Sequence, residues 1–240
     1  PIVGYAKMLV RGAKEGSQEQ KFSLGIQKAS ARAKDLVGQI LTFSRKSEDV
    51  DISSYKPIHI VPIVKEVLTL QRTALPKEIE LNRVLKTERD VVQADPTKIH
   101  QVLMNLSTNA WHAMRDRGGP GVLELMLTDF VIEARTKSTE FPKLKPGRYL
   151  RISIKDSGTG IPPHVLKRMF EPFFTTKKVG EGTGMGLAVV HGVVTSMHGG
   201  VSVDTEVGKG TTFHIVLPTV EESAQEEEGH KEAVLPSGNE

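Results

Sequence analysis

The chain contains no cysteine among its 240 residues. Disulfides, thiolate metal ligands and a cysteine nucleophile are therefore excluded, which is compatible with a reducing compartment. No apolar run approaches the roughly 20 residues that span a bilayer, and no secretory signal pattern is present. We therefore expect a cytoplasmic location, and we expect any sensor or membrane anchor of the parent protein to lie outside these residues.

Charge of one sign is also scarce, since the formal net charge is +3. No block of lysine and arginine predicts a nucleic-acid partner or a membrane-surface patch. Hydrophobic residues make up 38% of the chain and charged residues 25%, which is typical of a globular protein. Residues 219–240 are the exception, because they are acidic and lack periodicity, and we expect them to form a disordered tail or linker.

Residues 1–45 predict a helical hairpin. Residues 1–11 carry an apolar pattern that indicates the end of a helix. The sequence of residues 12–17 indicates a turn. In 18–45 apolar residues recur three or four positions apart, which predicts an amphipathic helix of nearly 28 residues. Such a length is typical of a hairpin or bundle. The polar residues 46–57 predict a linker.

Residues 58–218 predict one α+β domain. Its expected strands are 58–61, 79–86, 121–132, 148–155, 200–206 and 211–217. Its expected helices are 62–74, 96–115, 162–170 and 184–198. The polar stretch between 132 and 148 is expected to connect two strands as a hairpin excursion.

The helix around residues 98–114 carries two stripes. One is apolar, and the other is formed by Gln101, Asn105, Asn109 and His112, which share a face at spacings of four, four and three. Asparagine is a poor residue for a helix interior, so two on one face require a reason. One hypothesis is a solvated face or a local backbone bond. The other is that amide oxygens bind Mg²⁺, with His112 donating to a phosphate.

Two glycine-rich segments, DSGTGI at 156–161 and GEGTGMGL at 180–187, flank FEPFFTTKK at 170–178. Glycines allow a backbone to approach phosphate oxygens closely and to point N–H groups at them. The second segment leads into a helix, whose N-terminus favours an anion. This arrangement predicts an ATP site closed by a mobile lid. Of Lys177 and Lys178, we expect one to be a solvated surface residue, and the phenylalanines to seat the lid by packing.

Asp156 ends an expected strand, where its carboxylate can accept a hydrogen bond from an exocyclic amine such as adenine N6. The alternative is a common turn aspartate before glycine. The GKGTTF segment at 208–213 is equally explained by a simple hairpin turn.

Taken together, the segments resemble the ATP-binding domain of sensor histidine kinases. NLSTNAWHAM resembles the family's N box, DSGTGI its first glycine box, FEPFFTTK its F box, GTGMGL its second glycine box and GKGTTF the element that follows. The resemblance covers about 58–218. It implies a two-layer α/β sandwich of the type shared with gyrase and the heat-shock chaperone ATPases, with helices on one face of a mixed sheet.

The resemblance also implies roles for individual residues. Asn109 corresponds to the catalytic Mg²⁺-binding asparagine, Asn105 to a second ion or phosphate contact, and Asp156 to the adenine-reading aspartate. Residues 161–182 would form the ATP lid. The complete set implied to bind ATP and Mg²⁺ is Asn105, Asn109, His112, Asp156, Gly158, Gly160, Lys177, Gly182, Thr183, Gly184, Met185, Gly186, Leu187, Thr211 and Thr212.

The first 45 residues resemble the family's dimerisation and phosphoacceptor hairpin, which implies a homodimer and a response regulator receiver domain as partners. PIVGYAKML resembles the end of its first helix, and the helix ending in ILTFSR its second. The phosphoacceptor histidine would precede PIVGYA. The histidines of this sequence stand elsewhere, at 59, 100, 112, 164, 191, 198, 214 and 230. We therefore expect a fragment that binds ATP, dimerises weakly or non-natively, and does not phosphorylate itself at the family's site.

Two other functions stay open at this point. One is a regulatory module of the same fold that senses nucleotide without chemistry. The other is an ATPase of the gyrase or mismatch-repair type, which shares the asparagine and the aspartate-glycine element but not the F box combined with this second glycine box.

Overall fold

The computed structural model describes residues 2–44, 55–133, 138–177 and 182–220. The predicted tail beyond residue 220, most of the predicted linker 46–57 and Lys178 lie outside these ranges. No helix in the described ranges has the length and apolarity that crossing a membrane requires.

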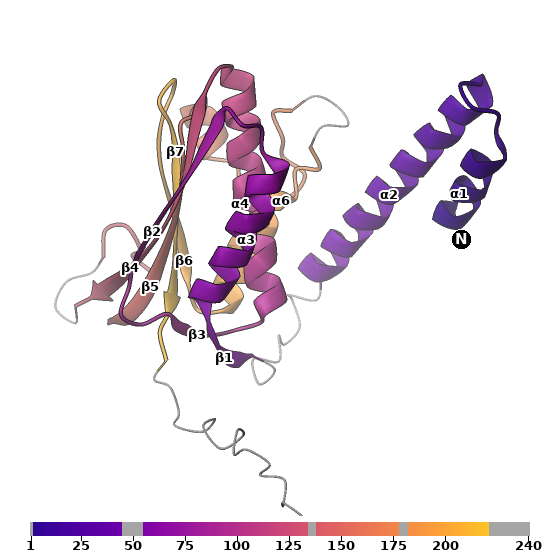
Figure 1. Ribbon diagram of the computed structural model, residues 1–240. Coiled ribbons are helices and arrows are strands. Elements are labelled where there is room, and N and C mark those ends of the chain that lie inside the picture. Colours follow the sequence, from indigo (N-terminus) through magenta and orange to yellow (C-terminus); the bar gives the residue numbers. More distant parts are fainter. Residues whose placement is uncertain (1, 45–54, 134–137, 178–181, 221–240) are drawn as a thin grey trace, which may run out of the picture.

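The N-terminal hairpin consists of α1 (Ile2–Gly12) and α2 (Gln18–Ser44), which lie side by side and apart from the sheet (Figure 1). The hydroxyl of Ser17 accepts a hydrogen bond from the backbone N–H of Gln20 at 3.1 Å, which caps the start of α2. Several large apolar side chains of this hairpin are exposed: Ile2, Tyr5, Met8, Leu9, Phe22, Leu24 and Ile26.

The remaining residues form a two-layer α+β structure, as the sequence predicts. The main sheet has the order β2-β4-β5-β7-β6, in which β2 and β4 are parallel and the other neighbours antiparallel. Its strands are β2 (Ile79–Lys86), β4 (Gly121–Ile132), β5 (Gly147–Asp156), β6 (Gly200–Glu206) and β7 (Gly210–Pro218). β4 pairs with the whole of β5, from Leu123 to Ile132, so the predicted hairpin excursion joins neighbouring strands.

Three helices cover one face of this sheet (Figure 1). They are α3 (Ile60–Ala74), α4 (Pro96–Arg117) and α6 (Gly186–Ser196). The alternating pattern of β5 turns Leu150, Ile152 and Ile154 toward the helices, and these side chains are nearly inaccessible to solvent. The core therefore lies between the sheet and the helix layer.

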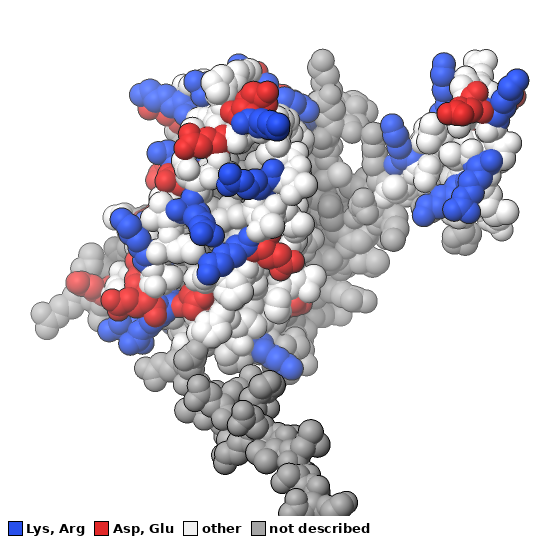
Figure 2. Space-filling model, in the orientation of Figure 1, with Lys and Arg blue, Asp and Glu red and all other residues white. Residues whose placement is uncertain are grey.

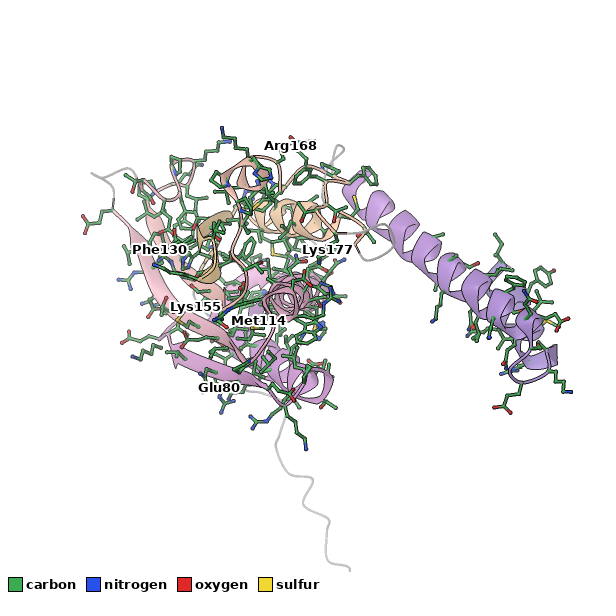
Figure 3. The ribbon with its side chains drawn as sticks, turned by 90° about the horizontal axis from the view of Figure 1, so that it is seen from above. Glu80, Met114, Phe130, Lys155, Arg168 and Lys177 are labelled. Carbon is green, nitrogen blue, oxygen red and sulfur yellow. The ribbon has the colours of Figure 1, made fainter. Side chains whose placement is uncertain are left out.

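Local sequence signals define both ends of α4. The Asp95 carboxylate caps the first turn by accepting from the backbone N–H of Thr97 at 2.8 Å, and Pro96 occupies the first helical position. Gly118 ends the helix with a φ of 78°. The apolar stripe is buried against the sheet, and Figure 3 shows Met114 between the sheet and this helix. The polar stripe therefore faces away from the core.

The start of α3 differs from the prediction. A strand was expected at 58–61, whereas β1 is Lys56–His59 and the helix begins at Ile60. The reason is a cap from a distant residue, since the Asp90 carboxylate accepts from the backbone N–H of Val61 at 2.9 Å and from His59 Nδ1 at 2.8 Å. Such a contact is not visible in the local sequence.

Two further differences concern short segments. The sequence did not predict β3 (Val91–Ala94), which pairs with β1 in a separate two-stranded sheet. The helix expected at 162–170 is reduced to α5 (Pro163–Leu166). Beyond it the chain forms consecutive turns, in which the N–H groups of Arg168, Glu171 and Phe174 each bond to the carbonyl three residues earlier.

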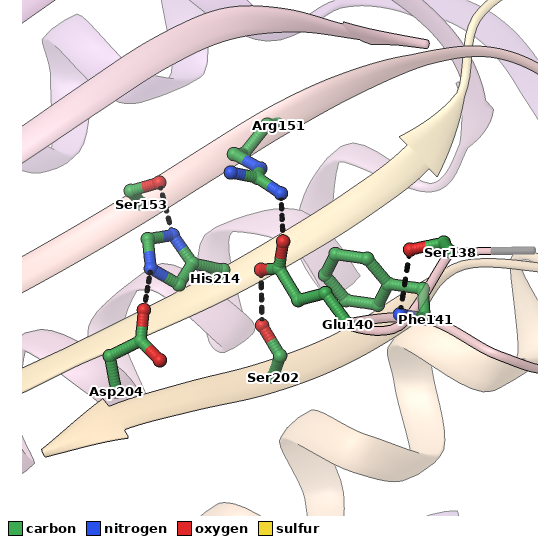
Figure 4. Close-up of polar contacts among 8 residues, drawn as sticks. All are labelled: Ser138, Glu140, Phe141, Arg151, Ser153, Ser202, Asp204 and His214. Atoms are coloured by element: carbon green, nitrogen blue, oxygen red, sulfur yellow. Dashed lines mark hydrogen bonds and ion pairs between the residues drawn. The ribbon is translucent and has the colours of Figure 1, made fainter. Parts of the chain in front are cut away.

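The other face of the main sheet carries a polar network (Figure 4). His214 links Ser153 at 2.7 Å to Asp204 at 3.1 Å, and Glu140 links Arg151 to Ser202. The Arg151 guanidinium also lies 4.2 Å from the centre of the Phe130 ring. These contacts fasten the connection between β4 and β5 across the sheet, on the side away from α4.

Candidate functional site: a cavity beside helix α4

A cavity of about 750 Å³ lies at the end of β5, between α4, α6 and the segment that follows β5. Its volume is within the range of small-molecule sites. Its lining is apolar near the sheet and polar along α4. The lining residues are Asn109, Ala110, His112, Ala113, Arg115, Asp116, Asp156, Thr159, Gly160, Ile161, Pro162, His164, Val165, Met169, Thr176, Lys177, Leu187, Val207, Thr211 and Phe213.

Asp156 is the buried carboxylate of this cavity, with 5% of its surface exposed. Its Oδ1 accepts a hydrogen bond from the backbone N–H of Gly158 at 2.7 Å. Burial raises the pKa of the Asp156 carboxyl, and the N–H groups of Gly158 and Thr211 offset only part of that rise. A buried carboxylate with remaining acceptor capacity is suited to bind a ligand N–H group.

Glycines are required around Asp156 because the backbone approaches it closely. A side chain at Gly210 would place its Cβ 2.0 Å from the Asp156 carbonyl oxygen, and φ is 123° at this position. At Gly158 a Cβ would lie 2.6 Å from the Cβ of Ala113 on α4. These contacts hold the end of β5, the following turn and α4 together around the carboxylate.

The polar stripe of α4 meets the F-box segment at the other end of the cavity. The Lys177 ammonium donates to Asn109 Oδ1 at 3.3 Å and lies 2.7 Å from His112 Nδ1. Asn105 lies one turn earlier, where its amide donates to the carbonyl oxygen of Gly186 at 3.3 Å. The start of α6 is thus attached directly to this stripe.

Asn109 meets the chemical requirement for a magnesium ligand. Its amide oxygen faces the cavity, and in this structure it already accepts from a cation, the Lys177 ammonium. Among the described residues no group of three or more histidine, aspartate or glutamate side chains could hold a metal ion. A magnesium ion here would therefore depend on amide oxygen, water and ligand oxygens, which suits Mg²⁺.

Charge around the cavity is mixed rather than uniform. Arg115, Asp116, His164 and Lys177 all line it. On the face shown in Figure 2, basic side chains lie over α3 and the neighbouring sheet edge with acidic side chains beside them. A charged ligand in the cavity would therefore meet cationic side chains such as Lys177 and Arg115.

Seven of the fifteen residues that the sequence singled out line the cavity. Those lining the cavity are Asn109, His112, Asp156, Gly160, Lys177, Leu187 and Thr211. Gly158, Asn105, Gly182, Thr183, Gly184, Met185 and Gly186 are not lining residues. They lie in the turn after Asp156, on the α4 stripe and in the segment that leads into α6.

Thr212 does not join this group. It pairs with Lys155, whereas Thr211 pairs with Asp156. Since neighbouring residues of a strand point to opposite faces, Thr212 faces the side away from α4. Thr211, by contrast, is buried and reaches the cavity.

Sequence reasoning missed several apolar lining residues, including Ile161, Met169 and Phe213. Phe213 alternates with Thr211 on β7, so the strand pattern would have placed it on the cavity side. Met169 carries no such signal, because the turns after α5 and not a helix bring it inward.

The chain belongs to the family of histidine kinase-, DNA gyrase B- and HSP90-like ATPases, whose model matches residues 94–221, more than half of the chain. Its relatives within this family confirm the resemblance to sensor histidine kinases. Sensor kinase CckA of Brucella abortus (strain 2308) is 37% identical over 81% of this chain and 20% of its own length. Sensor histidine kinase ZraS of Escherichia coli (strain K12) is 30% identical over 90% of this chain and 42% of its own.

A solved structure supports the same fold. Full-length ShkA in complex with AMPPNP matches with a TM-score of 0.68 and 24% identity, over 91% of this chain and 42% of that chain. The chain thus spans between one fifth and about two fifths of these proteins. The predicted two-layer α+β fold is confirmed.

The raised pKa of Asp156 predicts a pH-dependent contribution to stability. Because the folded protein holds this proton more tightly than the unfolded chain, Asp156 favours folding fully below its unfolded pKa of about 3.9. That contribution is lost as the pH rises through the higher folded pKa. In urea unfolding between pH 3.5 and 7, the stability of the unmodified protein relative to Asp156→Asn should therefore fall as pH rises. A relative stability that increases with pH would contradict this assignment.

Proposed function

We propose that the chain is the ATP-binding catalytic region of a sensor histidine kinase, and that the cavity holds ATP. The observation that carries this proposal is the position of Asp156. It is a buried carboxylate in a cavity whose lining also includes apolar side chains and the contact group Asn109, His112 and Lys177. A nucleotide has the matching polarity, with a flat base at one end and phosphates at the other.

The adenine base would lie against the apolar lining. Ile161, Met169 and Phe213 supply apolar surface, and Asp156 would accept from the N6 amine. A guanine base presents a carbonyl oxygen at the corresponding position, which would face the carboxylate as a second acceptor. Burial of the site strengthens this discrimination because an unpaired polar group costs more there than in water.

The phosphates would lie toward α4 and the start of α6. Lys177 supplies a positive charge, and the glycine segment 182–186 precedes a helix N-terminus, which favours an anion. Asn109 would hold Mg²⁺, and Asn105 would contact a second ion or a phosphate. When bound, the ion neutralises charge that develops on the transferred phosphoryl group. ShkA, which shares this fold, was solved with the ATP analogue AMPPNP.

The reaction in the whole protein would be phosphoryl transfer to histidine. The unprotonated ring nitrogen of a histidine bonds to the γ-phosphorus while the bond from that phosphorus to the β–γ bridging oxygen breaks, so that ADP leaves and the other ring nitrogen can release its proton. The residues of this chain would position the nucleotide and exclude water. The phosphoryl group would then pass to an aspartate of a response regulator.

We propose that these 240 residues alone do not perform that transfer at the family's site. No histidine occurs in the sequence before residue 59, so α1 and α2 contain none. The second candidate function is a nucleotide-sensing module of the same fold that binds ATP or ADP without chemistry. Incubation with γ-labelled ATP, with and without an added hairpin peptide that carries the histidine, separates the two functions.

The exposed apolar side chains of α1 and α2 support a homodimer through this hairpin. Exposed apolar surface of this extent commonly marks an interface, and a second copy would cover it with twofold symmetry. Sedimentation equilibrium should show self-association that Phe22→Glu weakens at least tenfold. A chain that stays monomeric at high micromolar concentration would contradict the proposed homodimer.

Calorimetric titration with ADP and Mg²⁺ tests the nucleotide site. We expect binding in the micromolar range, which Asp156→Asn weakens about 10- to 100-fold because a hydrogen bond to a buried charge is lost. Asp204→Asn is the matched control, since Asp204 lies on the opposite face of the sheet with its side chain 81% exposed. Equal losses in both variants would show that the effect is not local to the cavity.

The role of Asn109 predicts an effect of magnesium on nucleotide affinity. In the unmodified chain, ADP should bind more tightly with Mg²⁺ than with EDTA. Asn109→Ala should remove most of this difference, because a metal ligand is lost. A variant that keeps the full magnesium dependence would exclude Asn109 as a ligand.

A further inference from the structure

Lys177 occupies a specific place in the nucleotide-free protein. Its ammonium crosses from the F-box segment to α4, where it reaches Asn109 and His112, which are one helical turn apart. Figure 3 shows Lys177 on the helix side of the sheet. Since Lys177, Asn109 and His112 all line the cavity, this contact spans its polar end.

The chemistry of the groups fixes how protons are arranged in this contact. An ammonium has three donors and no acceptor. His112 Nδ1, 2.7 Å away, must therefore be the acceptor and carry no proton. Two contacts of Lys177 are thus to neutral acceptors, the imidazole nitrogen and the Asn109 amide oxygen. A phosphate oxygen would be a stronger partner because it is charged.

The backbone and the aliphatic part of the Lys177 side chain also have close contacts, in addition to those of the ammonium group. Its backbone N–H donates to the hydroxyl of Thr175 at 3.2 Å. Gly182 packs so closely that a Cβ there would lie 3.1 Å from Lys177 Cδ and 3.0 Å from Thr175 Oγ1. Thr175 and Gly182 therefore both lie against Lys177 and help to direct its side chain toward α4.

We propose that Lys177 is an internal cation that latches the site until a nucleotide binds. It contacts Asn109 Oδ1, the atom proposed above to bind Mg²⁺, and His112 is the second anchor of the latch. Incoming phosphates draw Lys177 away and free the amide oxygen for the metal. The inference rests on the proposed nucleotide site. It adds that the Lys177 ammonium and Mg²⁺ compete for one ligand atom, Asn109 Oδ1.

The latch predicts an opening step before or during nucleotide binding. Removing the His112 anchor would take one of these contacts from Lys177, so the latch would open more often. A hydrogen bond to a charged donor is strong enough for its loss to raise the open population on the order of tenfold. His112 would then slow association, whereas a residue that only contacts bound nucleotide would slow dissociation.

Hydrogen exchange and stopped-flow association on the full chain test the latch. We expect His112→Ala and Lys177→Met each to accelerate amide exchange in residues 173–177 of the nucleotide-free protein. His112→Ala should also raise the association rate of mant-ADP about tenfold. The double variant should exchange no faster than Lys177→Met alone, because both changes remove one contact. His100→Ala is the control, since His100 lies on the same helix α4 but is not among the residues that line the cavity.

The outcomes separate the latch from the nucleotide site itself. Binding by His112→Ala with an unchanged or slower association rate and unchanged exchange would overturn the latch and leave the nucleotide site intact. Additive effects in the double variant would overturn it as well. No mant-ADP binding by the unmodified chain would overturn the proposed function and, with it, the latch. Unchanged thermal unfolding of each variant shows that the comparison is made on folded protein.

Discussion

The buried carboxylate of Asp156 is the interaction on which the site depends. It lies where β5 ends, and it is stabilised by backbone N–H groups that reach it only because glycine stands at 158 and 210. The same close approach brings the turn after β5 against Ala113 of α4. Burial opposes ionisation, so the fold carries a destabilising group at neutral pH. Such a group is explained by a ligand that pairs with it.

Helix α4 connects this carboxylate with the polar end of the cavity. Its apolar stripe fixes it on the sheet, and its opposite stripe presents Asn109 and His112 to the F-box segment. Asn105 attaches the start of α6 through the carbonyl of Gly186. In the proposed nucleotide complex, this one helix would set the distance between the base and the phosphates. The segment carrying Lys177 is attached to that helix by side-chain contacts, which can be exchanged for contacts to a ligand.

Much of this arrangement could be predicted from the sequence, because the signals are local. The strands 79–86, 121–132 and 200–206 have alternating patterns and clear turn residues, and the stripes of α4 follow from helical periodicity. What could not be predicted depends on distant contacts. Asp90 caps α3 from another loop, and turns after α5 bring Met169 into the cavity. Thr212 was placed in the site by its motif, but the alternation of β7 turns it to the other face.

The most direct test of the account is the relative affinity for two nucleotides that differ only in their base. Equilibrium titration of the chain with ADP and with GDP, both with Mg²⁺, compares the same phosphates and ribose. If Asp156 accepts from an adenine amine, ADP should bind at least about 100-fold more tightly, since the guanine carbonyl would leave the buried carboxylate unpaired. Equal affinities would mean that Asp156 does not contact the base, and would contradict the proposed orientation of the nucleotide in this cavity.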